Sequence, residues 1–295
     1  MSVLTLTGIK KNYGTVQALN GVSFSVPEGT VYGILGPNGS GKTTLLGIIM
    51  DILRPSAGTY KIFNEIPSEM QRKQIGTLLE TPNFYHYLTA VQNLQIAAAI
   101  KERGMGDIDK VLKMVNLYER KDSRFNTFSL GMKQRLAIAS CMLGDPEVLV
   151  FDEPTNGLDP VGIAEIRELI KELNRQGKTI IMASHLLDEV EKVCTHVAIL
   201  KRGELLTSGP VDEILASEDI VEIAAADMDK LMIIMQNKGG YNTVKVEDNM
   251  LKLFYPVGTA SLENINRYCF ENGVTLSLLV LRKKSLESKF IELTN

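Results

Sequence analysis

One segment, residues 36–43 with the sequence GPNGSGKT, constrains this chain more than any other. It matches the pattern G-x-x-x-x-G-K-[ST], follows a short apolar run at 30–35 and precedes a helical pattern at 42–50. Glycines at these places let consecutive backbone N–H groups turn inward around phosphate oxygens. Strand, glycine loop and helix in this order predict an α/β fold that binds a nucleotide through its phosphates.

Each residue type in this loop has a separate task. The lysine, Lys42, reaches the β- and γ-phosphates, and the hydroxyl of Thr43 is suited to ligate Mg²⁺. The sequence therefore predicts ATP and Mg²⁺ as ligands of this segment. The predicted phosphate-contacting residues are Gly36, Pro37, Asn38, Gly39, Ser40, Gly41, Lys42, Thr43 and Thr44.

Charge and composition exclude several classes of function. A formal net charge of −3 provides no basic stripe, so we expect no nucleic-acid partner. The cysteines Cys141, Cys194 and Cys269 form no ligand pattern, which favours buried free thiols in a reducing cytoplasm. The N-terminus lacks the apolar core of a signal peptide and no run of eighteen apolar residues occurs, so we expect no membrane span.

Periodicity along the chain predicts two structural units. A largely helical pattern at about 88–145 indicates a helical subdomain, and apolar runs at 148–151 and 179–183 indicate buried strands. After about 218 the order is strand, helix, two strands, helix and strand, which is typical of a small α+β unit of the split βαβ type. We expect one domain at 1–217 and an accessory domain at 218–295.

Shorter signals complete the expected order of elements. Alternating apolar residues near the N-terminus predict two or three short antiparallel strands within 4–26. An amphipathic pattern predicts a helix at 161–176, and a turn at 201–203 predicts a hairpin that closes the first domain.

Two adjacent acids, Asp152 and Glu153, end the apolar run at 148–151. Carboxylates at the end of a buried strand are costly unless a metal ion or a polarised water compensates them. In this interpretation Asp152 holds Mg²⁺, and Glu153 positions or deprotonates the attacking water. An acidic strand end that caps the next turn explains the pair as well, because Pro154 follows it.

Several further segments carry a family resemblance. Residues 128–135, FSLGMKQR, resemble the signature of ABC (ATP-binding cassette) proteins, and residues 156–159, NGLD, resemble their D-loop. His185 resembles the switch histidine, and Tyr13 looks like the aromatic residue that stacks on adenine. Over residues 1–215 the chain is therefore similar to an ABC-type P-loop NTPase. That fold is a mixed sheet with flanking helices, an antiparallel β subdomain and a helical subdomain.

The resemblance implies a mechanism that needs two cassettes. Family members pair head to tail, and each ATP lies between the phosphate loop of one cassette and the signature serine of the other. Ser129 and the helix that begins near Gly131 would present hydrogen-bond donors to the γ-phosphate. His185 would donate to the same phosphate, and Lys42, Glu153 and His185 are the expected catalytic residues. Ser129 is equally suited to be an ordinary N-cap.

The chain departs from the usual family pattern in two places. Leu130 and Met132 stand where the family has glycine and glutamine in its signature. Glu80 stands where the Q-loop glutamine belongs, and this substitution with the signature resembles the bacitracin-resistance and lantibiotic-immunity exporters. We expect Glu80 to ligate Mg²⁺ directly or through water, with a solvated acid in a loop as the alternative.

The resemblance implies an ATPase that drives export of a peptide antibiotic, drug or similar amphipathic molecule through separate membrane-spanning subunits. The aromatic residues at 84–88 would line the groove for a coupling helix, although core packing explains them nearly as well. The partner cassette would be a second copy, and the chain would lie on the cytoplasmic face of the plasma membrane. The alternatives are a soluble ABC ATPase acting on the ribosome or DNA, and a mechanotransmission or sensing complex that transports nothing.

Overall fold

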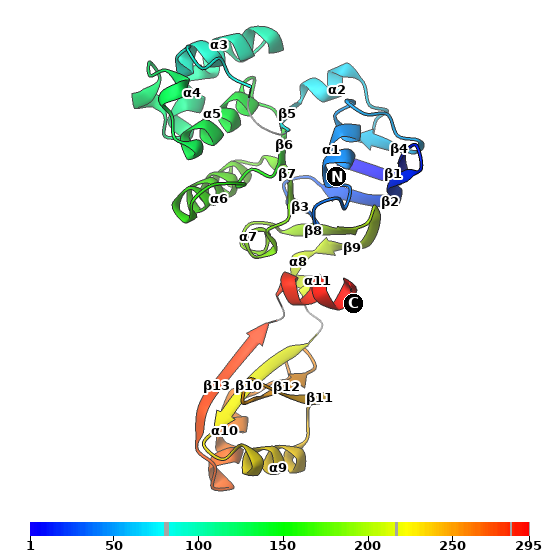
Figure 1. Ribbon diagram of the computed structural model, residues 1–295, viewed down its shortest axis with the longest axis vertical. Helices are drawn as coiled ribbons and strands as arrows, with labels where there is room; N and C mark the ends of the chain where they lie inside the picture. Colours follow the sequence, from blue (N-terminus) through cyan, green and yellow to red (C-terminus); the bar gives the residue numbers. More distant parts are fainter. Residues whose placement is uncertain (80–82, 216–217, 284, 295) are drawn as a thin grey trace. The chain divides into compact units, whose positions relative to one another are not determined.

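A six-stranded sheet forms the centre of the first of two units (Figure 1). The computed structural model describes residues 1–79, 83–215, 218–283 and 285–294. Contacts between Cα atoms divide the chain into Met1–Gly209 and Pro210–Asn295, a few residues before the boundary expected at 217. Each unit has an apolar core of its own, so each is described by itself.

The central sheet has the strand order β5-β6-β7-β3-β8-β9, and its first five strands are parallel. Every residue of β3, β6 and β7 is buried, as expected of parallel strands covered on both faces. The apolar runs in the sequence thus predicted these strands correctly. The strands are β3 (Val31–Leu35), β5 (Ile75–Leu78), β6 (Val148–Asp152), β7 (Thr179–Ser184), β8 (His196–Lys201) and β9 (Glu204–Pro210).

An antiparallel sheet with the order β2-β1-β4 completes the β structure of this unit. Its strands are β1 (Ser2–Tyr13), β2 (Val16–Pro27) and β4 (Ala57–Ile62). The strands β1 and β2 are twelve residues long each, so the expectation of short N-terminal strands was wrong. The register shifts along this pair, and such irregularities let a long ribbon bend while it stays paired.

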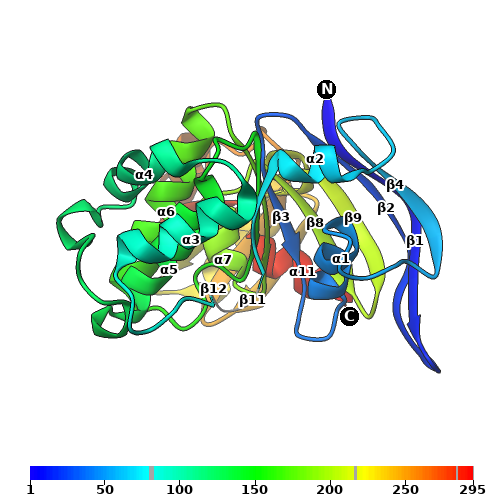
Figure 2. The same ribbon diagram turned by 90° about the horizontal axis from the view of Figure 1, so that it is seen from above.

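Helices flank the central sheet and also form a group of their own. Four of them pack on strands of the sheet: α2 and α5 on β5, α1 on β6 and α6 on β7. Figures 1 and 2 show α3, α4 and α5 grouped at one end of this unit, with β1, β2 and β4 at the other. The predicted helical subdomain is therefore present. The helices are α1 (Lys42–Ile49), α2 (Glu69–Lys73), α3 (Ala90–Lys101), α4 (Ile108–Met114), α5 (Leu130–Met142), α6 (Pro160–Arg175) and α7 (Leu187–Glu191).

The second unit contains an antiparallel sheet with the order β11-β12-β10-β13. Alternate residues of β10 and β12 are buried, and they pack with α9 and α10 into one core. This order is that of the split βαβ arrangement predicted from the sequence. Its elements are α8 (Val211–Leu215), β10 (Asp219–Ala225), α9 (Met228–Lys238), β11 (Thr243–Glu247), β12 (Met250–Tyr255), α10 (Leu262–Glu271), β13 (Leu276–Lys283) and α11 (Leu286–Thr294).

The cysteines are free and buried, as the sequence predicted. Burial raises the pKa of the Cys141 thiol to about 12, so this side chain is a neutral packing group at physiological pH.

Among the described residues, no helix combines the length and the apolar character that crossing a bilayer requires.

Candidate functional site

Three neighbouring parallel strands bring the predicted site residues to one edge of the central sheet. The register pairs Leu35 with Ser184 and Asp152 with Ala183, so β3, β6 and β7 end side by side. Ligands of open α/β sheets bind outside the carboxyl ends of such strands. The residues that follow the strands are the start of the phosphate loop, Glu153 and His185.

The Lys42 side chain is folded into the phosphate loop. It is 6% exposed, and its Nζ donates hydrogen bonds to the carbonyl oxygens of Gly36 at 2.8 Å and Pro37 at 3.3 Å. Nζ also lies 3.5 Å from Glu153 Oε1. A buried ammonium group needs such partners, and they hold its positive charge where phosphate oxygens would compete for it.

The loop depends on glycine at its last turn. Gly41 is the N-cap of α1 and has φ 102°, a conformation that residues with a Cβ rarely adopt. A Cβ at this position would lie 2.7 Å from both the carbonyl oxygen of Ala18 and Leu19 Cδ2. Gly41 therefore lets β2 approach the loop closely and sets the entry into α1.

Glu153 is held in a strained backbone conformation directly after β6. Its φ is 49°, which is uncommon for a residue with a side chain and is a feature that clusters at functional sites. Its backbone N–H donates to the Ala183 carbonyl at 3.0 Å, so the turn is fixed by the neighbouring strand. This turn places the carboxylate between Lys42 on one side and His185 on the other.

His185 contacts Glu153 through both its side chain and its backbone. Its Nδ1 lies 2.9 Å from Glu153 Oε2, and its backbone N–H donates to the same oxygen at 3.4 Å. Because the carboxylate only accepts, Nδ1 carries the proton in this contact. The neutral ring then has Nε2 as an acceptor, and only a protonated ring would donate from both nitrogens.

A cavity of about 490 Å³ lies over the loop and β2. Seven of its lining residues belong to the predicted site: six residues of the loop and Glu153. Asp152, which precedes Glu153 at the end of β6, is 7% exposed and does not line the cavity. Its lining residues are Val16, Gln17, Ala18, Asn38, Gly39, Gly41, Lys42, Thr43, Thr44, Glu153 and Arg202.

Four of the lining residues were missed by the sequence reasoning. Val16, Gln17 and Ala18 begin β2, and Arg202 lies in the turn between β8 and β9. Ala18 of β2 packs closely against Gly41 of the loop and against Gly203, which follows Arg202 in the β8–β9 turn. The turn at 201–203 was visible in the sequence, but its neighbours in space were not.

Ser129 and Gly131 lie at the start of α5 and do not line this cavity. Ser129 is the N-cap of α5, because its Oγ accepts a hydrogen bond from the Met132 backbone N–H at 3.3 Å. Leu130 is half exposed, and its Cδ2 approaches Gly157 of the segment 156–159. The departure from the family signature thus places an aliphatic side chain beside the predicted D-loop.

Tyr13 lies at the end of β1, where it pairs with Val16 across the hairpin. Its ring is 47% exposed, and the Lys11 ammonium lies over it at 5.0 Å from the centroid. Tyr13 is not among the cavity residues, although its partner Val16 is. Glu80 lies outside the described residues, so its position is not part of this geometry.

Comparison with known proteins agrees with this fold. The family model "ABC transporter" matches residues 19–156. The bacitracin transport ATP-binding protein BcrA of Bacillus licheniformis is 34% identical over 99% of this chain and 97% of its own length. The lantibiotic transport ATP-binding protein SrtF of Streptococcus pyogenes is 34% identical over 75% of this chain and 95% of its own.

A solved structure gives the same result. The dimeric post-hydrolysis structure of the ATP-binding cassette MJ0796, bound to ADP and Pi, matches with a TM-score of 0.62 and 28% identity. The match covers 70% of this chain and 98% of that one. Fold and site define a P-loop nucleotide-binding protein. The chain belongs to the ABC transporter family as an ATP-binding subunit, and ATP hydrolysis is the characteristic activity of these domains.

Proposed function

We propose that this chain hydrolyses ATP to drive export of a peptide antibiotic, drug or similar amphipathic molecule through separate membrane-spanning subunits. One observation carries the chemistry: the Glu153 carboxylate lies between Lys42 Nζ at 3.5 Å and His185 Nδ1 at 2.9 Å. The relatives named for bacitracin and lantibiotic transport, which match over nearly their whole lengths, support the class of cargo.

The chain's own residues divide the hydrolytic work. Lys42 moves its hydrogen bonds from the loop carbonyls to the β- and γ-phosphates. Its charge attracts the phosphate oxygens more strongly there than in water, because the site partly excludes water. Glu153 accepts a proton from the attacking water as the oxygen of that water bonds to the γ-phosphorus. The bond from the γ-phosphorus to the β–γ bridging oxygen breaks at the same time, and ADP leaves with that oxygen. His185 holds Glu153 in place and donates to the γ-phosphate when its ring is protonated or released from the carboxylate.

The residues present fit a magnesium ion that is bound together with ATP. The described residues contain no group of three or more His, Cys, Asp or Glu side chains able to hold a metal alone. Mg²⁺ prefers one or two carboxylates plus substrate phosphates, a set that Asp152 and the Thr43 hydroxyl complete. When bound, the ion would neutralise charge on the phosphates.

A second copy of the chain would complete each ATP site. Ser129 and the N-terminus of α5 lie apart from the cavity over the phosphate loop, so they are free to meet the nucleotide of a partner. The dimeric structure of the related cassette supports this arrangement. In it, Tyr13 would stack on adenine, and Gly131 would let the partner's phosphate approach the backbone closely.

A separate cavity of about 570 Å³ is the proposed contact for a membrane subunit. It is lined by residues of the segments 77–79 and 83–85 and of α3 and α5, including Phe84 and Tyr85. Asn93 is 2% exposed and fixes this segment, because it accepts from the Tyr85 N–H at 2.8 Å and donates to the Tyr85 carbonyl at 3.1 Å. A helix from a membrane subunit would dock here and place the chain on the cytoplasmic face of the membrane.

Glu80 is proposed to bind Mg²⁺ directly or through water and to link the nucleotide to this cavity, whose lining begins at Thr77. We expect Glu80→Gln to shift the Mg²⁺ concentration for half-maximal ATPase activity upward. Glu80→Asp keeps the charge and is the matched control. Unchanged ATPase rate, Mg²⁺ dependence and transport in Glu80→Gln would contradict this role.

The experiment that tests the function captures the assembled complex. Tagged Glu153→Gln protein is expected to bind ATP without releasing products, so it should hold its partners in detergent-solubilised cells. Recovery of a multi-span membrane protein supports the exporter, and its gene neighbourhood then narrows the cargo. Recovery of ribosomal or DNA-associated proteins alone would overturn the proposal in favour of a soluble ABC ATPase.

A further inference from the structure

The helix α7 begins two residues after His185 and is only five residues long. A helix this short has little intrinsic stability, so its position depends on what it packs against. The position of His185 depends in turn on α7, because one short turn of chain connects them. The contacts of α7 therefore bear on the geometry of the His185–Glu153 pair.

One contact holds α7 on the central sheet. Val190 is fully buried, and a Cβ placed on Gly33 of β3 would lie 2.7 Å from its Cγ1. The Val190 side chain therefore occupies the space that the absent side chain of Gly33 leaves. This contact fixes the distance of α7 from the sheet but is apolar and non-directional.

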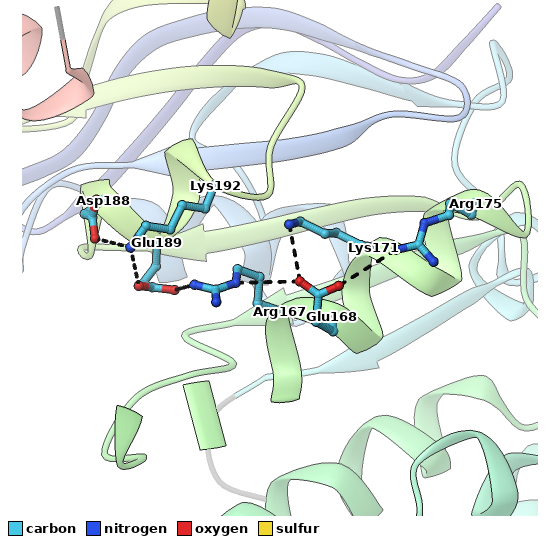
Figure 3. A network of polar contacts seen from close by, with 7 residues as sticks. All are labelled: Arg167, Glu168, Lys171, Arg175, Asp188, Glu189 and Lys192. Carbon is cyan, nitrogen blue, oxygen red and sulfur yellow. Dashed lines mark hydrogen bonds and ion pairs between the residues drawn. The ribbon is translucent and has the colours of Figure 1, made fainter. Parts of the chain in front are cut away.

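A second contact joins α7 to α6 and is directional. Arg167 Nη1 donates a hydrogen bond to Glu189 Oε2 at 3.2 Å, and the two side chains are 23% and 19% exposed. Lys192 Nζ contacts the other oxygen of the same carboxylate at 3.2 Å, so both oxygens of Glu189 are engaged. Figure 3 shows this chain of contacts, in which Arg167 is the residue that connects the two helices.

The helix α6 is itself well anchored next to the nucleotide site. It begins directly after residues 156–159, and Asp159 caps it by accepting from the Gly162 N–H at 2.9 Å. Its inner face is buried, which makes it a firmer support than α7. The Arg167–Glu189 pair thus ties the short helix α7 to α6, which is sixteen residues long.

We propose that Arg167 is a positioning residue for hydrolysis, which acts through Glu189 and α7 to hold His185 against Glu153. The proposal rests on the catalytic role given to His185 under the proposed function. Arg167 does not line the cavity over the phosphate loop, so its loss should slow the chemical step without weakening ATP binding. By contrast, an ion pair between exposed side chains of a single helix does not hold α7, so its removal should leave the rate of hydrolysis unchanged.

The test compares steady-state ATPase kinetics of the complete chain with Mg²⁺ and ATP. We expect Arg167→Ala to lower kcat by about tenfold and to leave the KM for ATP within about twofold. The charge exchange Arg167→Glu with Glu189→Arg should recover part of the lost rate. The matched control is Arg175→Ala, which removes ion pairs with Glu168 and Glu172 on α6 alone and should keep the full rate.

A double-mutant cycle shows whether the effect passes through His185. If it does, Arg167→Ala should cause no further loss in a His185→Ala background. The inference is overturned if Arg167→Ala keeps the full rate, or if its loss is the same in both backgrounds while His185→Ala alone is slow. A His185→Ala variant with the wild-type rate would instead refute the role of His185 itself, and the inference with it.

Discussion

The two units of this chain differ in what they bury. Among the described residues, every buried Lys, Asp, Asn, Ser or Thr side chain lies within Met1–Gly209. Examples are Lys42 at the start of α1, and Asp152 and Ser184 at the ends of β6 and β7. The core of the second unit is apolar apart from Tyr255 and Cys269. Burying charge costs free energy unless a task or a ligand compensates it. The contrast indicates that nucleotide chemistry belongs to the first unit and that the second is built for packing.

The largest expected effect tests the packing role of the second unit. Leu253 of β12 is fully buried in the core that this strand forms with α9 and α10, so Leu253→Ala should destabilise this unit by about 2–5 kcal/mol. ATP binding should be unchanged. Hydrogen–deuterium exchange read by peptide separates the units, and Val246→Ala, at a 58% exposed position, is the control. Weaker ATP binding in Leu253→Ala would mean that the second unit supports the site.

The next effect concerns the loop of the first unit. Gly41→Ala should cost about 1–2 kcal/mol for its positive φ and in addition weaken ATP binding at least tenfold, because the new Cβ displaces Ala18 and Leu19. Gly177→Ala is the matched control, since Gly177 also has a positive φ but has open space around it. Calorimetric titration with ATP should separate the two variants. Equal ATP affinities would contradict the account of the loop.

The sequence predicted the local part of the site better than its surroundings. The motif at 36–43 and the acids after 148–151 are contiguous patterns, and the parallel strands bring them together for a general topological reason. The cavity residues Val16 and Arg202 were not predicted, because their place in the cavity depends on how β2 and the β8–β9 turn pack on the loop. The same limit applies to Arg167 and Glu189, which are 22 residues apart and pair only through tertiary packing.

A smaller effect distinguishes the two tasks of Ser129. Ser129→Ala removes the cap of α5 and should lower stability by about 1 kcal/mol. Ser129→Asp keeps a capping oxygen but brings a negative charge towards the phosphate of a partner's ATP. If the proposed dimer forms, Ser129→Asp should retain stability and lose ATP-dependent dimerisation in size-exclusion chromatography with light scattering. Dimerisation by Ser129→Asp as in the wild type would remove Ser129 from the interface.

The smallest expected effect comes from exposed ion pairs and should be the same in both units. A hydrogen bond from Lys178 lowers the pKa of Asp145 in the first unit, and one from Lys252 lowers the pKa of Glu247 in the second. A carboxylate with a depressed pKa stabilises the fold above its unfolded pKa, and the contribution is lost as the pH falls through the folded value.

Asp145→Asn should therefore lower stability at neutral pH by less than about 1 kcal/mol, because Asp145 is largely exposed. At acidic pH the difference in Tm between the variant and the wild type should be smaller than at neutral pH, since the Asp145 carboxyl group becomes protonated and is then neutral like the asparagine amide. Thermal unfolding at the two pH values measures this. A difference in Tm that is larger at low pH than at neutral pH would contradict the stabilising role of the Asp145 carboxylate.

The central claim is that Glu153 is the base of an ATPase site in which Lys42 and His185 hold its carboxylate. The most direct measurement is single-turnover hydrolysis of ATP by Glu153→Gln beside the wild type, with ATP affinity measured on the same samples. The account predicts that hydrolysis slows by about 10²–10⁴-fold while ATP still binds. Hydrolysis by Glu153→Gln at the wild-type rate would contradict it.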